Sequence, residues 1–194
     1  MTRHDRVMSR VLITYSTVDG HTRHICDKLR AQLEVAGHSV VLKNIDEATP
    51  ADLAASDAVL IGASIRYGKH RPAVAAFIAR HQRELEARPN ALFSVNVVAR
   101  KPGKDAPEGN PYLQKLLRSI AWKPRRLEVF AGRLDYPKLG PLDRTMIRFI
   151  MWITKGPTDP RGTFEFTDWK RVEAFGAAFA TDLAAVGRQA VPPS

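Results

Sequence analysis

Short buried strands alternate with amphipathic helices along most of this chain, and this alternation constrains its fold more than any other feature. The apolar run at residues 10–15 has the length of a buried strand, and a helical pattern follows at 20–36. Further strands are predicted at 39–45, 57–63, 91–97 and 127–134, and further helices near 72–86, 111–121 and 167–186. Such an alternation is typical of a parallel sheet with helices on both faces.

Five predicted strands in 194 residues favour an α/β fold with a doubly wound parallel sheet of order 2-1-3-4-5. In such a sheet, ligands bind at the carboxyl ends of the strands, beside the first strand. The loops after Tyr15, Gly62 and Val97 are therefore expected to form a site. We expect a single domain over residues 10–186 with an inserted helical segment at 135–160, a flexible extension at 1–9 and a flexible tail at 187–194.

The charge balance favours anionic partners. Lys and Arg number 30 against 20 Asp and Glu, and the formal net charge of +10 suits nucleic acid, anionic lipid or a substrate that carries carboxylates. No helix with base-reading side chains stands out, so we expect no nucleic-acid partner. The single cysteine, Cys26, cannot form an internal disulfide, and no secretion signal is recognisable, so the cytoplasm is the expected compartment.

The loop between the first strand and the first helix has the chemistry of a phosphate site. Its residues Thr17, Val18, Asp19, Gly20, His21 and Thr22 place hydroxyls and a glycine at a helix N-terminus, where free N–H groups and the helix dipole attract phosphate. The loop lacks the Gly-Lys-Ser/Thr ending of an ATPase loop and the spaced glycines of a dinucleotide turn. Asp19 is expected to aim its carboxylate at Arg23 or at solvent. The alternative is an ordinary capped helix start, in which Thr17 or Asp19 binds unpaired amides.

The spacing of Tyr15, Thr17, Gly20 and Thr22 resembles the signature of flavodoxin-like proteins, whose loop holds the phosphate of FMN. The resemblance implies a flavodoxin-like fold with non-covalently bound FMN. Two more loops at the same edge of the sheet are then expected to surround the flavin ring: Ser64, Arg66, Tyr67 and Gly68 after the third strand, and Asn96, Val97 and Val98 after the fourth. Tyr67 is the candidate for stacking on the ring, against the alternative of an ordinary half-buried loop tyrosine.

Cations gather in and just after these two loops, namely Arg66, Lys69, Arg71, Arg100, Lys101 and Lys104. Singly, each is an ordinary solvated charge, but together they predict a rim that binds substrate carboxylates, with Arg66, Arg100 and Lys101 as first candidates. His70 is the one candidate for a proton carrier, against the alternative of an ordinary loop histidine, and no catalytic residue is assigned. His21 and His24 have no nearby carboxylate or thiolate in the sequence, so no metal site is expected.

Three strings give a sharper resemblance. Residues 62–68 (GASIRYG), 94–102 (SVNVVARKP) and 167–169 (TDW) resemble the bacterial flavodoxin-like protoporphyrinogen dehydrogenases of haem biosynthesis, and the likeness extends over residues 10–183. This resemblance implies oxidation of protoporphyrinogen IX to protoporphyrin IX in three two-electron steps, with ubiquinone or menaquinone as the electron acceptor. It also implies peripheral contact with the cytoplasmic face of the inner membrane.

The inserted segment contains one unusually apolar helix, which resembles a segment of the same family. Over residues 143–153, Arg144, Arg148 and the following Lys155 share one narrow stripe, and apolar side chains fill the rest of the surface. This run is shorter than the roughly 20 residues that cross a bilayer. Two interpretations are open and can both hold. The helix packs against the body or a twin subunit, or it lies in the headgroup layer with Trp152 and the cations at the polar boundary.

Two other functions use the same fold. A flavodoxin-type electron carrier has no substrate of its own, but such carriers are typically acidic so that they dock basic partners, and the charge of +10 argues against this function. A quinone reductase that takes its electrons from NAD(P)H is the second alternative, and the sequence leaves it open.

Overall fold

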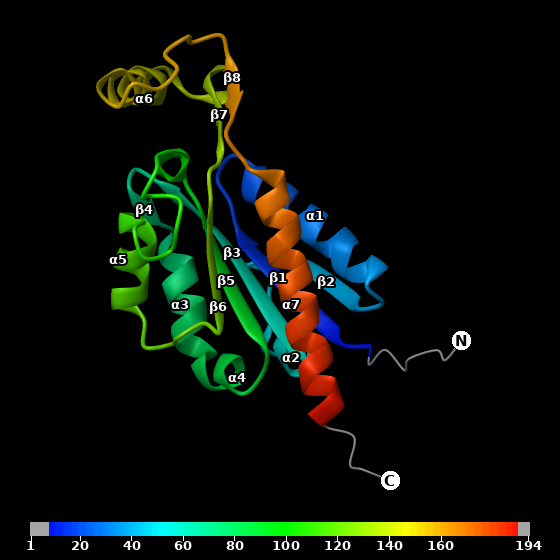
Figure 1. Ribbon diagram of the computed structural model, residues 1–194. Helices are drawn as coiled ribbons and strands as arrows, with labels where there is room; N and C mark the ends of the chain where they lie inside the picture. Colours follow the sequence, from blue (N-terminus) through cyan, green and yellow to red (C-terminus); the bar gives the residue numbers. More distant parts are fainter. Residues whose placement is uncertain (1–7, 190–194) are drawn as a thin grey trace.

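The computed structural model describes residues 8–189 and has five parallel strands at its centre (Figure 1). They are β1 (Arg10–Ser16), β2 (Ser39–Asn44), β3 (Ala58–Arg66), β5 (Asn90–Val95) and β6 (Arg126–Phe130), in the order β2-β1-β3-β5-β6. The short strand β4 (Lys69–His70) only pairs antiparallel with the end of β3. The five parallel strands therefore have the predicted order, and the prediction of a doubly wound α/β sheet is confirmed.

Helices cover both faces of this sheet. The helices α1 (His21–Val35) and α7 (Trp169–Gln189) cover one face, and α2 (Pro50–Ala54), α3 (Pro72–Arg80), α4 (Gln82–Glu86) and α5 (Pro111–Ser119) cover the other (Figure 1). Successive residues of a strand point to opposite faces, so Val11 and Ile13 join the core under α1 and α7, while Leu12 joins the other core. These two buried cores hold the carboxyl ends of the strands in fixed relative positions.

Two predicted elements are divided in the structure. The strand expected at 127–134 ends at Phe130, because the chain leaves the sheet there, and β7 (Arg133–Asp135) pairs instead with β8 (Thr163–Glu165) in an antiparallel ribbon. The helix expected at 72–86 is interrupted at His81. The backbone of His81 lies outside the helical region, with φ of −116°, and its ring packs on Phe77.

The ends of the chain differ slightly from the predicted boundaries. Ser9, in the predicted extension, is buried, and its carbonyl accepts a hydrogen bond from the Ser39 N–H (3.0 Å). At the other end, α7 continues to Gln189, past the predicted domain boundary at 186. The rest of the predicted extension and tail, residues 1–7 and 190–194, lies outside the described residues, and its flexibility stays a prediction.

The insertion stands apart from the main body of the protein. Between β7 and β8 the chain forms a short 3₁₀ helix, η2 (Tyr136–Lys138), and then α6 (Pro141–Ile153), and both lie beyond the carboxyl-terminal edge of the sheet (Figure 1). The insertion has a small core of its own, formed by Leu134, Tyr136, Leu139 and Met151. No helix within residues 8–189 is both long and apolar enough to cross a membrane.

The two arginines of α6 bind the insertion's own backbone. Arg144 donates to the carbonyl oxygens of Tyr136 (3.2 Å) and Leu139 (3.1 Å), and Arg148 donates to that of Thr158 (3.0 Å). Both guanidinium groups therefore tie α6 to its flanking segments, and their place at the polar boundary of a membrane stays a prediction. The third predicted cation, Lys155, lies beyond the end of the helix.

One side of α6 packs on the small core of the insertion and the other is exposed. Met151 is buried in the small core, and Ile147 packs partly against it. The exposed apolar side chains, which we call the outer face of α6, are Leu142, Met146, Phe149, Ile150, Trp152 and Ile153. Packing against the body, one of the two predicted interpretations, therefore holds only in part, because the inner side of this helix lies on the insertion's own core, against which Val97 of the main body packs.

Candidate functional site

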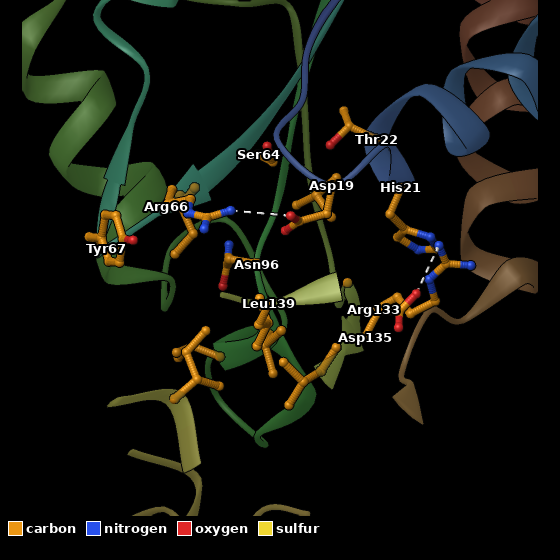
Figure 2. A pocket seen from close by; sticks show the side chains of 18 of the residues that line it. Asp19, His21, Thr22, Ser64, Arg66, Tyr67, Asn96, Arg133, Asp135 and Leu139 are labelled. Carbon is orange, nitrogen blue, oxygen red and sulfur yellow. Dashed lines mark hydrogen bonds and ion pairs between the residues drawn. The ribbon is translucent and has the colours of Figure 1, made fainter. Parts of the chain in front are cut away.

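A cavity of about 380 Å³ lies at the carboxyl ends of β1, β3 and β5. The three predicted loops converge on it, and they contribute Thr17, Asp19, His21, Thr22, Ser64, Arg66, Tyr67, Gly68, Asn96, Val97 and Val98 (Figure 2). Among the predicted cofactor-binding residues, Val18 and Gly20 do not line the cavity. The parallel topology explains the convergence, because it brings the ends of these strands to one edge of the sheet.

The insertion forms the opposite wall, which the sequence did not place here. This wall consists of Arg133, Leu134, Asp135, Leu139, Met146, Ile147, Ile150 and Met151. Tyr112 of α5 also lines the cavity, next to Gly68 on the sheet side. Arg133 lies near the carboxyl end of the fifth predicted strand, and this position is the one signal in the sequence that could have pointed to it. The cavity thus has a polar wall on the sheet side and a largely apolar wall on the α6 side.

The N-terminus of α1 has the features of an anion site. Gly20 precedes the helix with a left-handed backbone (φ +80°), and no side chain of the described chain caps the first turn. Thr17 accepts a hydrogen bond from the Gly20 N–H (3.0 Å). The predicted capping alternative therefore holds for the Gly20 amide before the helix, but not for the amides of the first turn of α1. The hydroxyl of Thr22 is buried and has no partner within residues 8–189. Such a group costs about 1–3 kcal/mol unless a ligand pairs with it, and a phosphate fits this position.

Asp19 pairs with a different arginine from the predicted one. Its carboxylate accepts a hydrogen bond from Arg66 at 3.2 Å, as the dashed line in Figure 2 shows, whereas Arg23 pairs with Asp27 (3.8 Å) on α1. The predicted pairing of Asp19 with Arg23 is therefore wrong, while the predicted exposure to solvent holds in part, since the side chain remains 49% exposed. The arginine neutralises a carboxylate beside the anion site, which removes the repulsion that Asp19 alone exerts on a phosphate.

Arg66 and Tyr67 also hold a carboxylate of the insertion. The guanidinium of Arg66 and the hydroxyl of Tyr67 both donate to Asp143 in the first turn of α6. The hydrogen bonds from Tyr67 and Arg66 lower the pKa of Asp143, so this carboxylate is ionised at neutral pH. Tyr67 has a left-handed backbone (φ 51°) and remains 62% exposed. Its hydroxyl therefore fastens α6, and the stacking of its ring on a flavin stays a prediction.

His21 is a neutral side chain in the wall beside the anion site. Its Nε2 lies 2.6 Å from the hydroxyl of Thr167, and that hydroxyl donates to the carbonyl of Ala131 (2.8 Å). Thr167 therefore accepts from Nε2–H, which leaves Nδ1 as an acceptor that is buried and unpartnered within residues 8–189. Burial lowers the pKa of His21 to about 4, so the imidazole is uncharged at neutral pH.

Comparison with known proteins decides the family. The flavodoxin domain matches residues 12–161. The protoporphyrinogen IX dehydrogenase (quinone) of Escherichia coli K12 is 40% identical over 171 residues, which are 88% of this chain and 94% of that protein. The Leishmania major protein of the same name is 41% identical over 174 residues, 88% of this chain and 74% of its own length. This chain belongs to the protoporphyrinogen IX dehydrogenase family.

Solved flavodoxins share the fold of this dehydrogenase-family chain. Flavodoxin 1 of Bacillus cereus has a TM-score of 0.51 at 13% identity and covers 89% of this chain and 98% of its own. A flavodoxin from an archaeon has a TM-score of 0.50 at 14% identity and covers 90% and 98%. The flavodoxin-like fold and the family resemblance seen in the sequence are thus confirmed, and the flavodoxin domain implies flavin binding.

In this family member, the predicted proton carrier lies behind the cavity wall. His70 contacts the Ser94 hydroxyl (2.9 Å), Asn96 donates to the same hydroxyl (3.2 Å), and Asn96 and Asn110 are hydrogen-bonded to each other. Burial lowers the pKa of His70 to about 4. His70 does not line the cavity. Its contacts instead support Asn96, which lines the cavity and caps the short 3₁₀ helix η1 (Val97–Arg100).

Two of the three predicted substrate-binding cations also lie outside the cavity. Arg100 donates to the carbonyl (3.2 Å) and the hydroxyl (3.0 Å) of Thr154 at the end of α6, and its guanidinium lies over the ring of Phe166. Neither Arg100 nor Lys101 contributes to the cavity wall, whereas Arg66 does. The cations that line the cavity are therefore Arg66 on the sheet side and Arg133 on the insertion side. No group of three potential metal ligands occurs among residues 8–189.

Proposed function

We propose that this protein oxidises protoporphyrinogen IX to protoporphyrin IX with a bound flavin and passes the electrons to ubiquinone or menaquinone. One observation carries the proposal. A single cavity joins an uncapped helix N-terminus, with the unpartnered hydroxyl of Thr22, to a largely apolar wall formed by the insertion. An electron carrier needs only the flavin end of such a cavity. The second wall, in a chain 40% identical to the E. coli dehydrogenase, supports a bound substrate.

The proposed flavin is FMN, held without a covalent bond. One phosphate suits the first-turn N–H groups of α1 together with the Thr22 hydroxyl, and Arg66 neutralises the nearby carboxylate of Asp19. When bound, the flavin accepts electron pairs from the substrate and delivers them to the quinone. The wall formed by Ser64, Tyr67, Gly68 and residues 96–98 is assigned to the flavin ring.

The other residues of the cavity bind the substrate and exclude water. Protoporphyrinogen carries two propionates, and Arg66 and Arg133 are the cations that line the cavity, so we assign them to these carboxylates. Arg133 thereby takes the role that the sequence suggested for Arg100 and Lys101. The apolar side chains of Ile147 and Ile150 shield the reacting part of the macrocycle from solvent.

The outer face of α6 is proposed to contact the cytoplasmic face of the inner membrane. Met146 and Ile150 are exposed and also line the cavity, so the cavity reaches this apolar face. A quinone is dissolved in lipid, and an apolar helix surface on a protein of net charge +10 suits an anionic membrane surface. A second copy of the chain is the other candidate for covering this face.

Anaerobic quinone reduction tests the proposed function. The purified protein should reduce ubiquinone or menaquinone analogues when protoporphyrinogen IX is supplied and should not do so with NADPH. Flavin released by heating should elute as FMN. Reduction with NADPH alone would identify an NAD(P)H:quinone reductase, and flavin reduction without turnover of either substrate would identify an electron carrier. Release of FAD would overturn the cofactor assignment.

A further inference from the structure

Arg66 and Tyr67 together form a binding site for a carboxylate, and in this structure a residue of the protein fills it. Both side chains donate to Asp143, which lies 77 residues from Arg66 along the chain. The side chain of Arg66 is 28% exposed and that of Asp143 17% exposed, so the pair is partly shielded from water. Arg66 and Tyr67 line the cavity to which we assign the substrate. The same donors are therefore within reach of a carboxylate that enters the cavity.

Asp143 contributes nothing to the cap of its own helix. Gly140 is the residue that precedes α6, and no side chain of the described residues caps its first turn. The Asp143 carboxylate instead reaches across to the sheet side of the cavity. If it leaves Arg66, it remains in the first turn of α6, where unpaired N–H groups and the helix dipole favour a negative charge. Release therefore leaves Asp143 with a favourable alternative environment.

The two ends of α6 are fastened in different ways. The N-terminal end is held to the sheet side by the charged contact between Asp143 and Arg66, whereas the C-terminal end is held by Arg100 through the neutral carbonyl and hydroxyl of Thr154. A ligand carboxylate competes directly with Asp143 because it is the same chemical group. Arg100 does not line the cavity, so a ligand bound there does not reach the contact with Thr154. The N-terminal end alone is thus open to displacement by an anionic ligand.

We propose that a carboxylate of the bound porphyrin replaces Asp143 on Arg66 and Tyr67 and thereby releases the N-terminal end of α6. This exchange rests on the proposed function, since it takes the porphyrin propionate as the incoming group. It couples substrate binding to the position of the wall that carries the outer face of α6. No bond is formed or broken in the exchange, and the hydrogen-bond donors keep a carboxylate partner throughout.

Binding of protoporphyrin IX to the flavin-loaded protein tests the exchange. The dimethyl ester of protoporphyrin IX, which has no free carboxylate, is the matched ligand. Asp143→Asn keeps the shape of the side chain and removes its charge, so it should lower the Kd for protoporphyrin IX by roughly threefold to tenfold, because the internal competitor is weakened. The Kd for the dimethyl ester should change by less than about twofold.

Asp27→Asn is the matched control variant. Asp27 pairs with Arg23 and Arg30 on α1, so its replacement removes the same charge at a site away from the cavity, and it should leave both Kd values unchanged. Asp143→Ala serves as a second variant should Asp143→Asn unfold. Unchanged or weaker binding of protoporphyrin IX to both Asp143 variants overturns the exchange. If the two carboxylates compete for Arg66 and Tyr67, removal of the Asp143 carboxylate must strengthen binding of the porphyrin carboxylate.

Hydrogen exchange of the α6 amides gives an independent readout. In the wild-type protein, protoporphyrin IX should increase exchange over residues 141–147, the dimethyl ester should not, and Asp143→Asn should show the increase without ligand. Protection of residues 141–147 by protoporphyrin IX overturns the proposal.

The turnover assay separates this proposal from the proposed function. The exchange pattern without turnover of protoporphyrinogen refutes the function and supports the exchange. Normal turnover of protoporphyrinogen, together with an unchanged Kd for protoporphyrin IX in Asp143→Asn, supports the function and refutes the exchange.

Discussion

The two walls of the cavity differ in how the protein holds them. The sheet wall rests on two large cores. Phe93 and Phe179 are completely buried in one of them, and Leu92 is completely buried in the other. The insertion wall rests on four buried side chains and leaves an apolar face exposed. Burial of apolar surface supplies most of the stability of a fold, so the sheet wall is firm and the insertion depends on individual polar contacts. The structure thus combines a firmly packed side, to which we assign the flavin, with a lightly packed side, to which we assign the substrate.

The largest expected effect comes from emptying the main core. Phe179→Ala should lower the free energy of unfolding of the whole domain by about 3–5 kcal/mol, because a buried aromatic ring leaves a cavity. Leu139→Ala, the corresponding change in the insertion core, should shift the main transition by less than about 1 kcal/mol and instead speed hydrogen exchange over residues 133–165. Urea unfolding followed by circular dichroism measures both. Equal losses in the two variants would contradict the contrast between the walls.

Charges on the outer face of α6 should affect membrane binding and little else. Phe149 and Trp152 are 59% and 70% exposed and do not line the cavity. The double change Phe149→Glu and Trp152→Glu should weaken binding to vesicles with anionic lipid by at least about tenfold, since two apolar side chains lose their burial. Val35→Glu, on a residue 85% exposed at the end of α1, is the matched control. Unaltered flotation of the double variant, or a fall in its stability, would argue for a covering protein surface.

Removal of the Thr22 hydroxyl should affect the flavin-bound state alone. Thr22→Ala should raise the Kd for FMN by about tenfold or more, because a hydrogen bond to a charged group is lost. The flavin-free protein should keep its stability or gain some, because the deleted hydroxyl is buried without a partner in the described residues. Thr22→Ser is the control. Fluorescence titration with FMN and thermal unfolding of the flavin-free protein provide the two measurements, and equal destabilisation of both states would indicate a purely structural role.

A variant of Arg133 tests whether the substrate carboxylates bind in the cavity or at the cationic loop that the sequence predicted. Arg133→Ala should raise the KM for protoporphyrinogen by about fivefold to tenfold, because a charged contact to a propionate is lost, and should leave the KM for quinone nearly unchanged. Lys101→Ala, outside the cavity, should leave both constants unchanged. Steady-state kinetics with each substrate varied in turn would show this. An effect of Lys101→Ala larger than that of Arg133→Ala would restore the loop as the substrate rim.

The smallest expected effect is a pH dependence of the free energy of unfolding, caused by two histidines on the sheet side. The folded-state pKa values of His21 and His70 are both lowered from 6.5 to about 4, so the unfolded chain binds more protons between these values. Stability is therefore complete above pH 6.5 and falls as the pH drops toward 4, by about 1 kcal/mol per histidine at pH 5.5. His70→Asn should reduce this loss in urea unfolding at pH 7.5 and 5.5. An unchanged loss would show that His70 does not carry it.

Local sequence patterns were sufficient to predict the sheet. The spacing of apolar residues along the chain is enough to predict which side chains of a strand or helix are buried. Ile25, Leu29 and Leu33 recur at helical spacing, and all three are buried. Short elements were missed although α2 has a visible signal, since Thr49 and Asp52 form a capping box around Pro50. The break after Phe130 has no such signal, because it depends on the pairing of β7 with β8, which is distant in the sequence.

The same distinction holds for the cavity. Thr17 and Asn96 directly follow β1 and β5, and Ser64 lies near the carboxyl end of β3, so topology alone brings them together. The positions of Asp143 and Arg100 depend on where the insertion folds back, and their partners lie 77 and 54 residues away. A run of cations in a loop could therefore suggest a rim but could not show which guanidinium groups are engaged by the protein itself.

The hydrogen bond from the Phe166 N–H to the Gly132 carbonyl (3.1 Å) joins the two points where the insertion leaves and re-enters the main body. Because these points are adjacent, residues 133–165 form a cassette that a tight turn can replace without changing the path of the remaining chain. A shortened protein of this kind should keep its sheet and its anion site while losing the wall assigned to the macrocycle. Deletion of residues 133–165 would then abolish oxidation of the porphyrinogen while the protein still binds its flavin.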